Sequence, residues 1–171
     1  MAGIDDTCIF TGTAAVNGQQ IIPQTVTNAD SMNYINLNEG KDAFGNILTN
    51  PDPGMGKPVF VNIVITSAPT AAGGNTTVVW TLLAGQDAGG TGTSQTGVGG
   101  TWITIGSTGT VPYDDLVLGW KFSFLVPPSM TYEQDAAIVA QYLKLNCATA
   151  TSTLTGGYYY AWMSPEPVSN V

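Results

Sequence analysis

Histidine and arginine are both absent from this chain of 171 residues, and four lysines face twelve aspartates and glutamates. Without histidine the chain lacks the commonest general base and the most frequent metal ligand in proteins. The net charge of -8 argues against nucleic acid as a partner, because binding it depends on lysine and arginine displacing counterions from phosphates. It also argues against docking on anionic membranes. We therefore expect no nucleic-acid partner and no membrane partner.

Charge of either sign is scarce, and so are long apolar runs. Charged residues make up 9% of the chain, whereas a soluble domain has about a quarter. No segment approaches the roughly 20 apolar residues that span a bilayer. Glycine, threonine, serine and asparagine replace the missing charge, and the length suits one domain. The acidity has two interpretations that stay open: simple solubility, or a face that repels DNA or meets a basic partner.

Cysteine is limited to Cys8 and Cys147. The first residues, MAGIDDTCIF, show neither the basic nor the apolar region of a signal peptide, so we expect none. Two cysteines in a cytosolic product are usually free and reduced. A disulfide between them stays possible if the two ends of the chain lie on neighbouring strands.

No constellation of residues suggests catalysis. Asp114 and Asp115 are adjacent, and on a strand they would point to opposite faces instead of converging. Their Pro-x-Asp-Asp context predicts a turn with solvated carboxylates. Residues 36–46 are rich in oxygen ligands, but their spacing does not match a calcium loop. We therefore predict no enzyme, no cofactor and no metal site.

Short segments rich in β-branched and aromatic residues run through the chain, with glycine, proline and asparagine between them. We expect strands at 7–11, 20–26, 32–37, 58–66, 76–84, 101–106, 119–127, 139–147 and 156–163. The best helix former, 133–140, gives two turns at most. Such spacing favours an antiparallel sandwich, jelly roll or barrel. Long loops are predicted at 38–57 and 85–100.

Period-two alternation assigns faces to these strands. The strands at 58–66 and 76–84 carry apolar residues on both faces and are expected to be covered on both sides. A hairpin of small residues, TSAPTAAGGNTT, is predicted to join them. Three sets are each expected to share one face of their strand: Val59, Val61, Ile63 and Ile65; Val78, Trp80 and Leu82; and Trp120, Phe122, Phe124 and Val126. In 139–147, Leu143, Leu145 and Cys147 are expected to point inward, and Tyr142, Lys144 and Asn146 outward.

The aromatic run Tyr158-Tyr159-Tyr160 with Trp162 is the most prominent local feature. In a strand, Tyr158, Tyr160 and Trp162 share one face. They would cap the core, form a packing face for a subunit or partner, or serve as a platform for stacking sugars.

Five strings in the chain are similar to those of a known family. They are GKPVFVNIVIT, TAAGGNTTVVWTLLAG, GWKFSFLVP, QYLKLN and TLTGGYYYAWM, and they fall within residues 31–163. Together they resemble the Bbp16-like capsid cement proteins of tailed bacteriophages. The family pattern has arginine where this chain has Gln141 or Lys144.

The resemblance implies an all-β, antiparallel, jelly-roll-like sandwich of about eight strands with long loops. An N-terminal arm or edge segment (1–30) would precede the β domain (31–163), and an extended tail (164–171) would follow it. Such a protein would be made in the host bacterial cytoplasm. It would form a homodimer or homotrimer on the exterior of an icosahedral phage head and clamp neighbouring major capsid subunits.

The expected interface residues are Ala71, Ala72, Tyr158, Tyr160 and Trp162. Bulky charged residues at Ala71 and Ala72 are expected to weaken shell binding and leave the fold intact. The main alternative is a secreted carbohydrate-binding or adhesin module, supported by the hydroxyl-rich surface and the aromatic run. Another virion part, such as a tail-tube or head-fibre subunit, is a third possibility.

Overall fold

The computed structural model describes residues 9–11, 19–25, 27–31, 34–36, 58–71, 73–85, 102–127, 131–132, 138–139 and 142–168. Cys8 and Ala72 lie outside the described residues, as do 37–57 and 86–101. The described residues hold no α-helix; their one helical segment is a 3-10 turn at Tyr113–Asp115.

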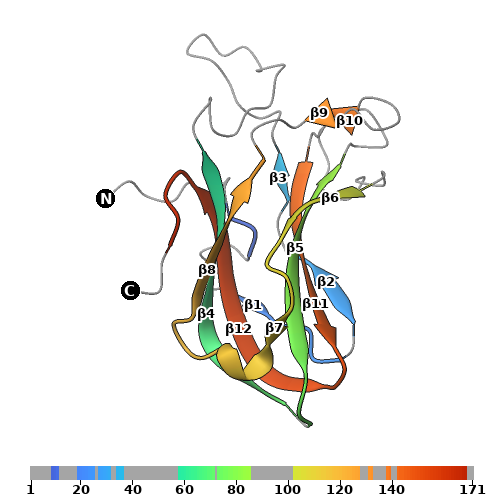
Figure 1. Ribbon diagram of the computed structural model, residues 1–171, viewed down its shortest axis with the longest axis vertical. Helices are drawn as coiled ribbons and strands as arrows, with labels where there is room; N and C mark the ends of the chain where they lie inside the picture. Colours follow the sequence, from blue (N-terminus) through green and yellow to red (C-terminus); the bar gives the residue numbers. More distant parts are fainter. Residues whose placement is uncertain are drawn as a thin grey trace.

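Two antiparallel sheets face each other (Figure 1). The first has the order β1-β12-β4-β8, formed by Gln20–Ile21, Leu154–Ser164, Val59–Ala71 and Lys121–Val126. The second has the order β2-β11-β5-β6, formed by Asn28–Asp30, Tyr142–Ala150, Thr77–Gly85 and Trp102–Ser107. Two short strands extend the second sheet: β3 (Ile35–Asn36) pairs with β11 and β7 (Val111–Pro112) with β5. A separate ladder joins β9 (Thr131–Tyr132) and β10 (Ile138–Val139).

The chain passes from one sheet to the other between β1 and β2, β3 and β4, β4 and β5, β7 and β8, and β11 and β12, and also, by way of the β9–β10 ladder, between β8 and β11. The β4–β5 and β11–β12 connections run next to each other, because β4 pairs with β12 in the first sheet and β5 pairs with β11 in the second. This strand order is that of a jelly roll, two interlocked Greek keys. The predicted all-β, jelly-roll-like sandwich is confirmed.

The connection between β4 and β5 was expected to be a hairpin, and this is wrong. β4 continues to Ala71, paired with β12, so that Leu154 lies opposite Ala71. β5 pairs instead with β11 in the other sheet. The turn at 73–76, with Asn75 at φ 70, therefore arches between the sheets. A run of small residues permits either geometry, and the long-range pairing decides between them.

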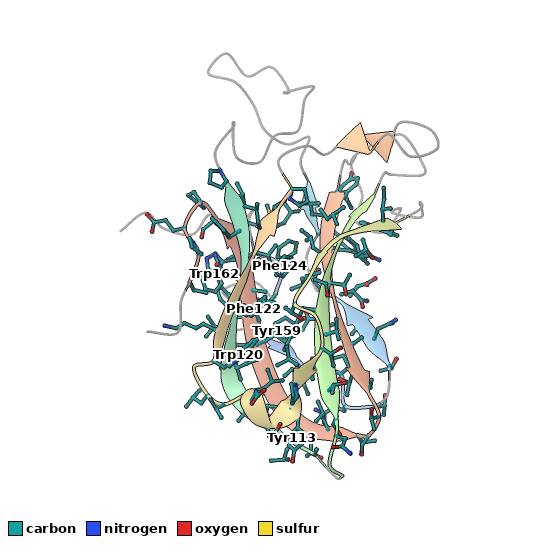
Figure 2. All side chains as sticks on the ribbon, in the orientation of Figure 1. Tyr113, Trp120, Phe122, Phe124, Tyr159 and Trp162 are labelled. Carbon is teal, nitrogen blue, oxygen red and sulfur yellow. The ribbon has the colours of Figure 1, made fainter. Side chains whose placement is uncertain are left out.

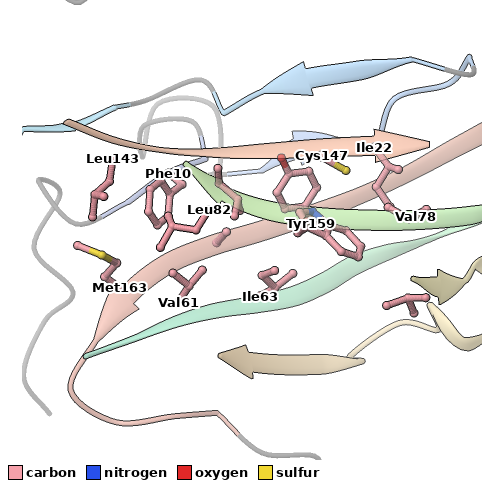
Figure 3. Close-up of a cluster of buried hydrophobic side chains, with 14 of the residues drawn as sticks. Phe10, Ile22, Val61, Ile63, Val78, Leu82, Leu143, Cys147, Tyr159 and Met163 are labelled. Carbon is pink, nitrogen blue, oxygen red and sulfur yellow. The ribbon is translucent and has the colours of Figure 1, made fainter. Parts of the chain in front are cut away.

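The core lies between the two sheets, and the predicted alternation holds. Val61, Ile63 and Ile65 are fully buried and face Val78, Trp80 and Leu82 from the other sheet (Figure 3). Residues of β11 and β12 complete the layer, together with two residues from the N-terminal segment. These are Leu143, Leu145, Cys147, Tyr159, Ala161, Met163, Phe10 and Ile22.

Aromatic rings span the centre of the core. The ring centroids of Trp80 and Tyr159 lie 5.6 Å apart in an edge-to-face arrangement, and Trp80 also stacks on Trp120 at 6.1 Å. Trp120, directly before β8, is followed by Phe122 and Phe124 on β8 (Figure 2), with successive ring centroids 5.7 and 6.4 Å apart. Edge-to-face and offset pairs stabilise a core beyond the area they bury.

Cys147, beside this layer, is a free and buried thiol. Its burial raises the pKa of the thiol well above the ordinary value. A neutral buried thiol is a poor nucleophile, because only the thiolate reacts.

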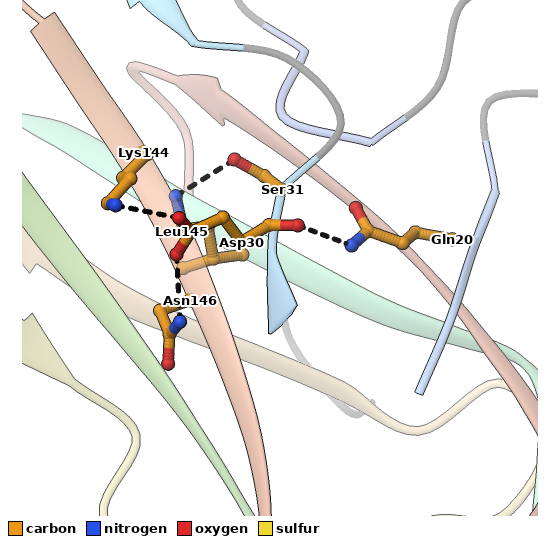
Figure 4. A network of polar contacts seen from close by, with 6 residues as sticks. All are labelled: Gln20, Asp30, Ser31, Lys144, Leu145 and Asn146. Carbon is orange, nitrogen blue, oxygen red and sulfur yellow. Dashed lines mark hydrogen bonds and ion pairs between the residues drawn. The ribbon is translucent and has the colours of Figure 1, made fainter. Parts of the chain in front are cut away.

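Lys144 was expected on the outward face of β11, and it is nevertheless buried, at 8% exposure. Its ammonium lies 2.7 Å from Asp30 Oδ2 and 4.2 Å from the centre of the Trp102 ring. Asn146 Nδ2 donates to the other carboxylate oxygen at 2.8 Å, and Gln20 Nε2 donates to the Asp30 carbonyl at 2.9 Å (Figure 4). These interactions hold β2, at one edge of the second sheet, against β11.

The buried hydroxyl of Tyr159 has no hydrogen-bond partner, and neither has Trp80 Nε1. Burial also raises the pKa of Tyr159. We expect Tyr159→Phe to change the free energy of unfolding by less than about 1 kcal/mol, because the hydroxyl loses only a weak interaction with the Trp80 side chain. Tyr159→Ala should cost about 3–5 kcal/mol through the cavity it leaves. Urea unfolding of the two variants measures the difference; equal losses would contradict this account of the core.

Candidate interaction surface

Exposed apolar side chains gather on the first sheet. The large hydrophobic residues that the structure describes as exposed are Ile21 (42%), Val117 (57%), Leu118 (72%), Leu125 (49%) and Tyr158 (40%). Ile21, Tyr158 and Leu125 belong to β1, β12 and β8, and Val117 and Leu118 form the turn that leads into β8. The second sheet contributes none of them. One side of the sandwich is therefore the more apolar side.

We call four of these residues, Ile21, Tyr158, Val117 and Leu118, the apolar band. Ile21 pairs with Tyr158, and Tyr158 pairs with Ser67 of β4. Directly paired residues point to the same face of a sheet. Beyond β4, Ile65 exchanges backbone hydrogen bonds with Gly119 (2.8 Å) and Trp120 (2.9 Å). The row of Ile21, Tyr158 and Ser67 thus ends at β4, and the turn that carries Val117 and Leu118 bonds to β4 two residues away, at Ile65, on the other side of a register shift.

The turn that carries Val117 and Leu118 is held by its backbone. Trp120 N donates to Val117 O at 3.0 Å, and Val117 N donates to Asp115 O at 2.9 Å. Gly119 has φ +84, a conformation that glycine adopts without strain. Leu116, only 1% exposed, anchors the turn in the core. Leu118 is therefore exposed on a fixed support.

The alternation along β12 is as the sequence predicts. Tyr159 is buried between the sheets, while Tyr158, Tyr160 and Trp162 share the outer face. The Tyr160 and Trp162 rings lie 5.1 Å apart and are half-buried, whereas Tyr158 is exposed. Within this run, Tyr159 is part of the core and Tyr158 is part of the apolar band.

Ala71, the other predicted interface residue that the structure describes, ends β4 and packs against the core. A bulky charged residue there would disturb the fold, contrary to the expectation that the fold would stay intact. Ile21, Val117 and Leu118 were not expected from the sequence as contact residues. Leu-Val-Leu-Gly directly after two aspartates was the available signal, since a run of apolar residues at a turn is unusual.

Polar chemistry on the described residues is sparse. Asp114 and Asp115 are exposed in the 3-10 turn, as predicted. Across the part of the chain that the structure describes, no three residues of the metal-ligating types cluster closely enough to hold an ion. Within the same part, no helix has the length and apolar character needed to cross a membrane.

Comparison with known proteins adds no relative: no family model matches the chain, and no curated protein sequence matches it. The surface must therefore be interpreted from its own geometry.

Two leucines of one turn provide a test of this geometry. Leu116→Ala should lower the free energy of unfolding by about 2–5 kcal/mol, because the side chain is buried in the core. Leu118→Ala should change it by less than about 0.5 kcal/mol, because the side chain lies in solvent. Thermal or urea unfolding checks both. A large loss in Leu118→Ala would place that side chain in the core and remove it from the apolar band.

Proposed function

We propose that this protein is a non-enzymatic structural component of a virion. In this proposal it is a capsid cement protein on the outer surface of an icosahedral phage head, where it clamps neighbouring major capsid subunits. Its partners are the major capsid protein and further copies of itself. The resemblance of the five sequence strings supports the proposal at the level of the sequence.

The observation that carries the proposal is the apolar band. Exposed apolar residues rimmed by polar ones are typical of a surface that contacts another protein. Tyrosine and leucine on a fixed support lose little conformational entropy on binding, which favours them as contact residues. The exposed Asp114 and Asp115, close to Leu118 in the sequence, favour a partner surface with positive charge around an apolar depression.

The jelly roll suits a protein that is present in many copies on a shell. Each contact can be weak, because many contacts act together when subunits are linked. The sheet edges are short at β1, with two residues, and at β2, with three. Short edge strands limit uncontrolled pairing between copies.

Co-sedimentation with capsid shells that lack this protein tests the proposal. The unmodified chain should bind saturably, in a fixed ratio to the major capsid subunit. Tyr158→Asp and Leu118→Asp should each weaken binding by about tenfold or more, since each places a charge in a desolvated contact. Thr104→Asp is the matched control, because Thr104 is an exposed strand residue on the second sheet, and it should bind as the unmodified chain does.

Absence of shell binding by the unmodified chain would refute the cement function. Saturable binding with equal affinity in all three variants would retain that function and exclude the apolar band as the contact.

A secreted carbohydrate-binding or adhesin module is the second candidate. The adjacent rings of Tyr160 and Trp162, 5.1 Å apart on the outer face, favour it, because aromatic surfaces present an apolar body with a polar edge. Co-sedimentation with insoluble polysaccharide distinguishes the two functions. Binding that Trp162→Ala abolishes, together with no binding to shells, would favour the carbohydrate module.

A further inference from the structure

The residues after β12 fold back onto the outer face of the first sheet. Asn62, near the start of β4, is fully buried although it points away from the core. Its Nδ2 donates to Ser164 Oγ at 2.8 Å and to the Glu166 carbonyl at 3.1 Å. Its Oδ1 accepts from Val168 N at 3.0 Å and lies 2.6 Å from Ser123 Oγ on β8. The tail thus supplies hydrogen-bond partners to the Asn62 side chain, which on an uncovered sheet surface would bond to water instead.

Asn62 and Ser123 together bind the backbone of the tail. Ser123 Oγ lies 2.9 Å from Val168 N and 3.0 Å from the Val168 carbonyl. The groups that are recognised on the tail are the Glu166 carbonyl and the amide and carbonyl of Val168. This pair of side chains therefore forms a site for an extended peptide, which we call the Asn62–Ser123 site.

The segment in the site is held by few other contacts. Pro165, Glu166 and Pro167 are exposed, and Val168 is half-buried. A segment with little buried apolar area opens at low cost compared with the core. Proline keeps the backbone extended when the segment is released, so the released tail loses little entropy on binding again.

We propose that the Asn62–Ser123 site also binds residues 166–168 of a second copy of this chain, so that copies associate by exchanging their tails. The site binds a segment that every copy of the chain carries. Exchange of an identical element keeps the same contacts in the dimer as in the monomer, so little contact energy is lost. The exposed Leu125, paired with the half-buried Phe60 beside the site, provides additional area for the second copy to cover.

The direct test joins a site on one copy to a tail on another. A tagged chain with Ser123→Cys is mixed with an untagged chain carrying Val168→Cys, both in a Cys8→Ser background with Cys147 buried. Oxidation should yield a disulfide-linked dimer of tagged and untagged chains. Replacing Val168→Cys by Thr104→Cys, an exposed position on the other sheet, should abolish that dimer.

One chain carrying both Ser123→Cys and Val168→Cys shows whether the two positions can form a disulfide at all. If this chain links only within itself and the mixture gives no mixed dimer, exchange is refuted.

Light scattering over a range of concentrations is the second measurement. The unmodified chain should form an oligomer. Asn62→Ala should raise its dissociation constant at least about tenfold through lost hydrogen bonds. Val168→Pro should do the same, because it removes the amide that the site binds while the site itself stays intact.

Mixing the two variants should restore association in part, since one copy supplies an intact tail and the other an intact site. A chain that is monomeric at every concentration, or an oligomer that neither substitution weakens, would overturn the proposal.

Discussion

The two sheets bury their apolar faces against each other, and the contact between Trp80 and Tyr159 lies at the centre of this packing. Trp80 lies on β5 and Tyr159 on β12, so the contact joins the central strands of opposite sheets. The inner faces of β4 and β11 align around it, and Phe10 from the N-terminal segment fills the same layer. The positions of the outer faces, and so of every surface feature, follow from this packing.

The two outer faces differ in how they are completed. On the second sheet, Lys144, Asp30 and Trp102 form a network that buries a charge against an aromatic ring and fixes β2. On the first sheet, Asn62 and Ser123 are covered by the tail, while the apolar band stays exposed. The first sheet is thus the side on which further contacts are available, and both proposals concern it.

The proposed function follows from how the chain distributes its chemistry. The sequence offers no histidine or arginine for catalysis or phosphate binding, and the large apolar side chains that the structure describes as exposed lie on the first sheet and on the turn that leads into β8. Val117 and Leu118 stand in solvent on a turn anchored by Leu116. A fixed and exposed apolar turn is suited to contact with another protein, because the turn is already ordered in the folded chain and loses little further conformational entropy on binding.

The sequence by itself determined the long strands and which of their side chains share a face, because period-two alternation is a local property; the short strands β2, β7 and β9 were not expected from it. In this way Leu145 was assigned inward, and Tyr159 was placed on the face opposite to Tyr160. Tertiary structure decided which strands pair, since pairing joins segments far apart in the chain, and this turned the expected β4–β5 hairpin into an arch. It likewise placed Ile21 beside Tyr158, buried Lys144, and brought Val168 to Asn62, 106 residues away. Local pattern contains no information on such long-range neighbours, because their geometry is set only when the two sheets close on one core.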